Sequence, residues 1–246
     1  MDSLRRHDPE QVLTVGGRIA ALSASETARL PWRSMVVPFA TLLAMRLHDA
    51  RLYYICGIDR LDTVEPALRG GVDVFQLRDK RASDDELLRA ASVLRRLCDE
   101  HGALFVLNDR PDLAAAAKAD GVHIGQDDMA VAEARAIVGP DVLIGRSTHT
   151  PQQVDGAQDA DYIGVGPVNP TPTKLGRPAV GTELVSYAAA QARVPFFAIG
   201  GLDGATLPAA VAAGATRAAV VRAISESPDP EAAARALRAA LAVPVG

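Results

Sequence analysis

The 246-residue sequence is poor in cysteine and lacks any long hydrophobic run, and each shortage excludes a class of protein. Its two cysteines, Cys56 and Cys98, fit no zinc-ligand spacing and are interpreted as buried thiols. We therefore expect a reducing compartment and a cytoplasmic location. Because no apolar stretch is long enough to cross a bilayer, we expect no membrane partner.

Aromatic residues are scarce as well, and acidic residues outnumber basic ones. Aromatic residues make up 4% of the chain, and the formal net charge is −4 with a pI near 5.7. An acidic chain without a general basic surface is not expected to bind nucleic acid. Any anionic ligand must then meet local positive groups or a metal ion. Hydrophobic residues still make up 48%, which is enough for a large aliphatic core.

Residues 1–50 differ from the rest of the chain. Segment 1–34 is of mixed polarity without a sustained period. We predict an N-terminal extension over residues 1–50, mobile or partly helical with a short helix around 18–30, followed by a catalytic domain over 51–246. The alternative is that Met35 or Met45 is the natural start. Deletion of residues 1–44 is expected to leave a folded enzyme.

From Arg51 onward, short apolar runs alternate with helical patterns. The runs are rich in β-branched residues, as strands buried on both faces are, and they occupy residues 52–56, 72–77, 103–107, 121–125, 142–146, 162–166, 195–199 and 218–222. Ser83 to Glu86 is a capping box that predicts a helix to about Glu100, and Pro111, Thr150-Pro151 and Asp203 are further helix-start signals. Eight such units predict a single (β/α)8 TIM barrel with an N-terminal extension. The runner-up is an open doubly wound sheet, which would show a glycine-rich turn after its first strand.

Acidic side chains follow two of these runs. Asn108-Asp109 ends the third, and Asp127-Asp128 follows the fourth. Neighbouring parallel strands lie about 5 Å apart, so the residues at their ends can share a ligand. Carboxylate oxygens there suit Mg²⁺, which keeps several waters for substrate phosphate. The alternative is that these acids cap the helices that follow.

Basic side chains follow the second run. Strand alternation puts Gln76, Arg78 and Lys80 on one side, with Asp79 between the two bases. Arg can bind a phosphate with two parallel hydrogen bonds, and Lys acts as a point charge. The alternative is ion pairing with a neighbouring aspartate.

The remaining signals follow runs six to eight. Residues 169–178 hold three prolines, two threonines and Lys174, and we interpret this segment as a substrate lid, with an ordinary exposed loop as the alternative. Gly200-Gly201 ends the seventh run, and Arg222 ends the eighth. The loops after strands seven and eight form the recurrent phosphate site of β/α barrels. The rim is therefore predicted to bind two anionic groups.

These motifs together resemble one family. The chain is similar to thiamine phosphate synthase from about residue 51 to 242, in unbroken order, through Gln76-Leu77-Arg78-Asp79-Lys80, Asn108-Asp109, His123 to Asp128, Gly145 to His149, Thr171 to Lys174 and Ile199-Gly200-Gly201. Each motif alone is weak evidence for this family, whereas the complete set in this order is specific to it. Two positions depart from the family pattern: Gly57-Ile58 inserts residues where Thr-Asp is usual, and Arg222 replaces a hydroxyl residue.

The resemblance implies a role for each matching residue. The residues implied to bind an aminopyrimidine diphosphate are Gln76, Leu77, Arg78, Asp79, Lys80, Asn108, Ser147 and Lys174. Those implied to bind a thiazole phosphate are Thr171, Pro172, Thr173, Gly201, Val221 and Arg222. Asp109 and Asp128 would hold one Mg²⁺ per subunit. Catalysis would fall to Arg78, Lys80, Ser147 and Lys174.

The implied activity is that of a transferase. The family joins the aminopyrimidine diphosphate to a thiazole phosphate, or its carboxylated form, and releases diphosphate by a dissociative substitution. A related thiazole tautomerase and a non-catalytic phosphate-ligand sensor remain as alternatives, and a homo-oligomer remains open. His123 is interpreted as packed or hydrogen-bonded, whereas His149 is equally compatible with a role in orienting the site.

Overall fold

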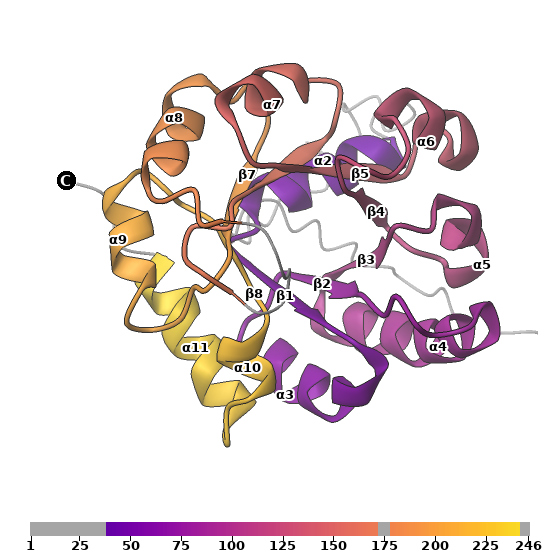
Figure 1. Cartoon of the computed structure of the whole chain (residues 1–246). Helices are drawn as coiled ribbons and strands as arrows, with labels where there is room; N and C mark the ends of the chain where they lie inside the picture. Colours follow the sequence, from indigo (N-terminus) through magenta and orange to yellow (C-terminus); the bar gives the residue numbers. More distant parts are fainter. Residues whose placement is uncertain (1–37, 172–177, 242–246) are drawn as a thin grey trace, which may run out of the picture. The chain divides into compact units, whose positions relative to one another are not determined.

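The eight predicted strands form a closed parallel barrel whose strand order follows the sequence (Figure 1). The computed structural model describes residues 38–171 and 178–241. The strands are β1 Leu52–Cys56, β2 Val74–Leu77, β3 Leu104–Asn108, β4 Gly121–Ile124, β5 Leu143–Thr148, β6 Tyr162–Val165, β7 Phe196–Ile199 and β8 Ala218–Val220. The predicted TIM barrel is thus confirmed. The helix predicted around 18–30 lies outside the described residues.

Strand alternation divides the apolar side chains into two layers. Tyr54, Phe75 and Phe105 belong to the cluster between the strands and the outer helices. Tyr53 and Phe197 belong to the cluster inside the barrel, where their ring centroids lie 5.2 Å apart. Both layers are buried, which explains why the strands are continuous apolar runs in the sequence.

The helices surround the barrel (Figure 1). They are α3 Val64–Arg69, α4 Asp84–His101, α5 Ala114–Ala117, α6 Val131–Val138, α7 Pro151–Gly156, α8 Glu183–Gln191, α9 Leu207–Ala212, α10 Arg222–Ser225 and α11 Pro230–Leu241, with 3-10 turns η2 Ile58–Thr63 and η3 Pro111–Leu113. None of the helices within 38–171 and 178–241 is long and apolar enough to cross a membrane.

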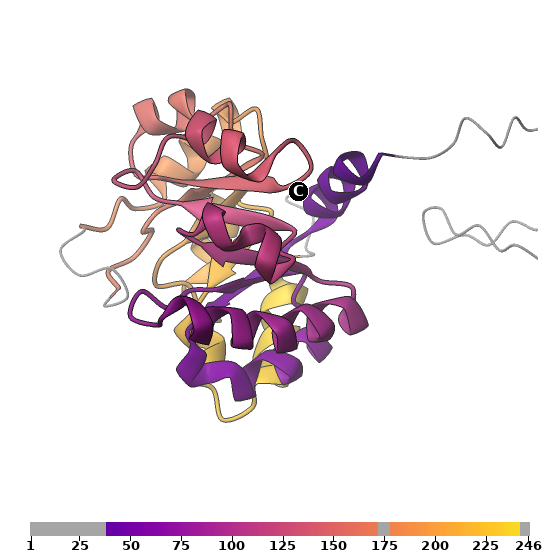
Figure 2. The ribbon, with the colours of Figure 1, turned by 90° about the vertical axis from the view of Figure 1, so that its right-hand side faces the viewer.

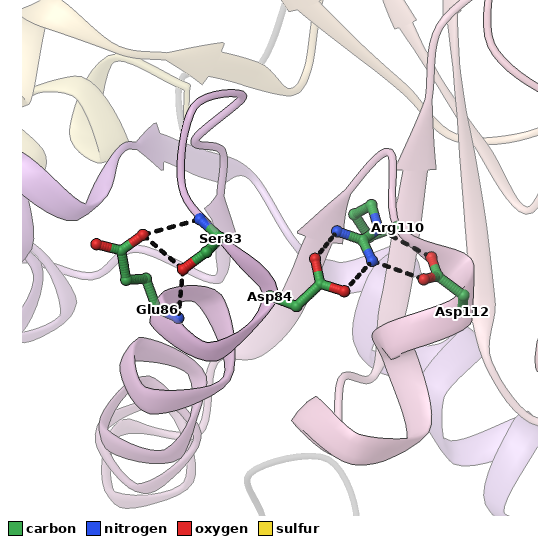
Figure 3. Close-up of polar contacts among 5 residues, drawn as sticks. All are labelled: Ser83, Asp84, Glu86, Arg110 and Asp112. Carbon is green, nitrogen blue, oxygen red and sulfur yellow. Dashed lines mark hydrogen bonds and ion pairs between the residues drawn. The ribbon is translucent and has the colours of Figure 1, made fainter.

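Local sequence signals explain where several helices begin and end. The capping box is present, because Ser83 N–H donates to Glu86 Oε2 at 2.8 Å and Glu86 N–H donates to Ser83 Oγ at 3.4 Å (Figure 3). Gly102 ends α4 in the left-handed conformation, with φ of 68°. Thr150 caps α7 as predicted. Pro111 begins a 3-10 turn rather than an α-helix.

One further helix, α2 Phe39–Asp49, precedes the barrel and packs against it. Helix α2 falls within the predicted extension 1–50, and the division at residue 50 stays a prediction. An apolar stripe holds the helix on the barrel: Leu43 and Leu47 lie one turn apart on α2, Ala50 follows as its C-cap residue, and all three are at most 2% exposed. They join the inner cluster, and α2 lies at one end of the barrel (Figure 2).

Candidate active site

A cavity of about 490 Å³ opens at the carboxyl ends of the strands. Most of the predicted site residues that the structure describes line it, and these are Gln76, Arg78, Lys80, Asn108, Asp109, Asp128, Ser147, Thr171, Gly201, Val221 and Arg222. Pro172, Thr173 and Lys174 lie outside the described residues. The two predicted anion sites therefore share one cavity.

Leu77 and Asp79 do not line the cavity with these residues. Leu77 is fully buried in the layer between strands and helices, because alternation turns it away from the barrel interior. The Asp79 carboxylate accepts from the backbone N–H groups of Ile58 and Arg81, at 3.4 and 3.0 Å. Asp79 thus ties the loop after β1 to the loop after β2.

Asp109 and Asp128 occupy the ends of neighbouring strands, and neither caps the following helix. Lys80 Nζ lies 2.8 Å from Asp109 Oδ2, and Asp128 Oδ2 accepts from Gly125 N–H at 2.7 Å. The N-cap residues are Arg110 for η3 and Ala130 for α6. The helix-capping alternative is therefore wrong for both acids.

The two carboxylates fit a magnesium ion that keeps most of its water. Both line the same cavity, and carboxylate oxygens are the protein ligands that Mg²⁺ prefers. Within the described ranges no group of three His, Cys, Asp or Glu side chains is placed to hold a metal. An ion bound here would accordingly take its other ligands from water and from a substrate phosphate.

Arg110 holds the loop that follows Asp109. Its guanidinium lies between Asp84 at the start of α4 and Asp112 in η3, with contacts of 2.5 and 2.9 Å to Asp84 and 3.0 and 2.7 Å to Asp112 (Figure 3). Hydrogen bonding to Arg110 lowers the pKa of both carboxyl groups. We call these three residues the Arg110 clamp.

The floor of the cavity is a chain of hydrogen bonds. Gln76 Nε2 donates to Tyr53 OH at 2.6 Å, and Tyr53 OH lies 2.9 Å from Tyr162 OH. His123 Nδ1 lies 3.3 Å from Tyr162 OH, and His123 Nε2 lies 3.0 Å from Ser147 Oγ. We call these five residues the floor relay. They come from five strands, and all of them line the cavity.

The opposite side of the cavity is built from close backbone contacts. Gly200 and Gly201 have φ of 105° and 59°, which disfavours any side chain there. A Cβ on Gly201 would also lie 2.8 Å from the Asn169 Cβ. The Gly201 carbonyl accepts from Thr206 Oγ1 at 2.8 Å. Arg222 pairs with Glu226 at 4.0 Å, and both side chains line the cavity.

A family model described as thiamine monophosphate synthase matches residues 52–224. The chain belongs to the thiamine monophosphate synthase family. It is 50% identical over 192 residues to the thiamine-phosphate synthase of Synechocystis sp., covering 76% of this chain and 56% of that protein. It is 49% identical over 205 residues to the thiamine-phosphate synthase of Acidothermus cellulolyticus, covering 80% and 97%.

A solved structure of similar sequence has the same fold. The thiamine phosphate pyrophosphorylase of Pyrococcus furiosus superposes with a TM-score of 0.73 at 32% identity, covering 81% of this chain and 97% of that chain. The chain spans little more than half the length of several of its cyanobacterial relatives, 56% for Synechocystis sp. and 54% for two Nostoc species.

The two departures from the thiamine monophosphate synthase pattern both lie at the cavity or beside it. Gly57 starts the 3-10 turn η2, and a Cβ there would lie 2.7 Å from Asp59 Oδ1. Arg222 begins α10 with its guanidinium at the cavity wall. His149 also lines the cavity, and its Nδ1 contacts the Gly166 carbonyl oxygen at 2.5 Å.

Sequence reasoning missed the two tyrosines of the floor relay. Tyr53 and Tyr162 stand inside apolar runs and were counted only as strand residues. Alternation could have placed them inward, since Tyr53 stands two positions before the lining residue Ile55 on the same strand. The cysteines need no functional role, because burial raises the pKa of both thiols to about 12.

Proposed function

We propose that this chain is a thiamine phosphate synthase. It would join 4-amino-2-methyl-5-(diphosphomethyl)pyrimidine to 4-methyl-5-(2-phosphoethyl)thiazole, or to the carboxylated form of the thiazole, and release diphosphate. The observation that carries the proposal is the single cavity with acids and bases at the ends of β2 to β4 and glycines with Arg222 at the ends of β7 and β8. The names of the relatives support the same reaction.

Positive charge in the loop after β2 would assist departure of the diphosphate. Arg78 and Lys80 line the cavity there, and the half-exposed Lys80 can turn from Asp109 toward a phosphate. Asp109 and Asp128 would hold Mg²⁺, which when bound supplies further positive charge to the leaving group. Lys174 is proposed to add a third cation.

The cavity wall would protect a cationic pyrimidine from water. Ile55, Phe197 and Ile199 supply apolar surface beside the floor relay. Because the aminopyrimidine can stabilise positive charge on its methylene carbon, the leaving group can depart before the new bond forms. The thiazole nitrogen would then attack while Gly201 and Arg222 hold its phosphate. This route needs no nucleophile from the protein.

The decisive experiment mixes the purified chain with both substrates, with and without Mg²⁺, and assays thiamine monophosphate and diphosphate. We expect equal amounts of both products, formed only with the metal. Isomerisation of a thiazole phosphate without condensation would instead indicate the tautomerase. Binding of phosphorylated ligands without any turnover would indicate the sensor.

A further inference from the structure

The order of donors and acceptors along the floor relay starts from Gln76, whose amide N–H can only donate. Gln76 contributes an amide N–H to Tyr53 OH, so the Tyr53 oxygen acts as an acceptor in that bond. Tyr53 has a single proton, and a buried hydroxyl proton requires an acceptor. Its neighbour Tyr162 OH lies 2.9 Å away and supplies one. If Tyr162 accepts the Tyr53 proton, its own proton is left for His123 Nδ1, which lies 3.3 Å from Tyr162 OH.

The ionisation of the two tyrosines agrees with this direction. Burial raises the pKa of Tyr53 and of Tyr162 well above the usual tyrosine value, so both hydroxyls keep their protons. A neutral imidazole that accepts at Nδ1 carries its proton on Nε2. In that tautomer His123 Nε2 would donate to Ser147 Oγ, which lies 3.0 Å away.

We propose that the floor relay orients the His123 ring with its proton on Nε2 and thereby makes the Ser147 hydroxyl a hydrogen-bond donor to the ligand. The Ser147 oxygen accepts from His123, so its single proton is directed to another acceptor. If the proposed function holds, that acceptor is a ring nitrogen of the aminopyrimidine. Tyr53, Tyr162 and His123 are then positioning residues that act through Ser147.

The space for the relay is provided by a glycine. Gly145 on β5 is in register with His123 on β4 and with Tyr162 on β6. A Cβ on Gly145 would overlap the Tyr162 ring and lie 2.5 Å from His123 Nδ1. Only the absence of a side chain at this position lets the two polar groups meet across β5. The contact is therefore built into the strand packing.

The first test reads the tautomer directly in the ligand-free protein. A long-range ¹H–¹⁵N spectrum of the histidine rings, assigned with a His123→Asn variant, should show His123 protonated at Nε2 only. Gly145→Ala should shift the His123 signals. Gly164→Ala is the matched control, because its Cβ would lie 3.6 Å from His123 Cε1, an ordinary contact. A His123 ring protonated at Nδ1 in the wild-type protein would overturn the proposal.

The second test separates the relay from general stability. Tyr162→Phe should lower kcat/KM for the pyrimidine diphosphate roughly tenfold, the usual effect of one lost hydrogen bond, with KM for the thiazole phosphate unchanged. Tyr54→Phe is the control, since Tyr54 OH bonds to Thr63 Oγ1 at 2.6 Å outside the cavity. Equal kinetics for the two variants would refute the positioning role. If the protein shows the expected His123 tautomer but no synthase activity, the proposed function is refuted and the role of the floor relay is not.

Discussion

Asp109 adopts a backbone conformation that few residues other than glycine adopt. Its φ is 59°, while its N–H still donates to the His123 carbonyl at 2.8 Å and so extends the pairing of β3 with β4. Aspartate and asparagine tolerate this left-handed region better than other side chains. The conformation therefore restricts the residue types that suit the position, and the carboxylate faces the cavity beside Lys80.

The Asp109→Asn variant tests the metal role without disturbing the backbone. Asparagine keeps the left-handed conformation but removes the charge that would bind Mg²⁺. We expect turnover to fall about 100-fold and the Mg²⁺ concentration for half-maximal rate to rise. Asp85→Asn, an exposed acid on α4, is the control. If calorimetry gives the same Mg²⁺ affinity for the variant and the wild type, Asp109 is not a metal ligand.

At the scale of elements, the Arg110 clamp joins the start of α4 to η3. Arg110 directly follows Asp109, so the clamp fixes the loop that presents the candidate metal ligand. Exposed ion pairs contribute little to stability, which suggests that the main effect is on geometry. The clamp also explains why Asp112 and Asp84 remain ionised to lower pH than isolated carboxyl groups.

Arg110→Ala should raise the Mg²⁺ requirement severalfold with little change in melting temperature at neutral pH. A carboxyl group whose pKa is lowered by folding stabilises the protein above its unfolded pKa and loses that contribution as pH falls through its folded pKa. The small stability difference between wild type and variant should thus begin to shrink below about pH 4 and disappear only below the folded pKa of the two carboxyl groups. Melting curves across this range and metal titrations check both statements. A stability difference that grows as pH falls would contradict the assignment of the lowered carboxyl pKa values to Arg110.

Helix α2 is predicted to be required for a stable barrel. Leu43 is fully buried in the inner cluster, so Leu43→Ala should reduce the free energy of unfolding by about 2–5 kcal/mol. Leu42→Ala is the control, because Leu42 is 46% exposed and should have little effect. Chemical denaturation measures both. Deletion of residues 1–44 removes Leu43, so the structure makes deletion of 1–37 the safer truncation.

At the scale of the whole molecule, the sequence predicted the barrel well because parallel strands buried on both faces are continuous apolar runs. The sequence also placed most of the cavity residues, because the polar side chains follow those apolar runs at the carboxyl ends of the strands. The floor relay was missed because it joins residues far apart in the chain, such as Tyr53 and Tyr162. The stripe on α2 was missed because it consists of only three buried residues, Leu43, Leu47 and the C-cap residue Ala50. The roles of the site residues stay predictions.

Closure of the barrel has a consequence for biosynthesis. Strand β1 pairs with β8 through Leu52 and Ala218, and α11 packs beside α3 with Arg69 Nε 2.9 Å from Glu231 Oε2 (Figure 1). Strand β1 leaves the ribosome before β8, so one edge of β1 stays uncovered until β8 has been made. An unpaired strand edge made of residues that are buried in the native fold favours aggregation. A nascent chain that stalls between β1 and residue 218 would keep that edge exposed, which makes this interval a vulnerable stage in producing the barrel.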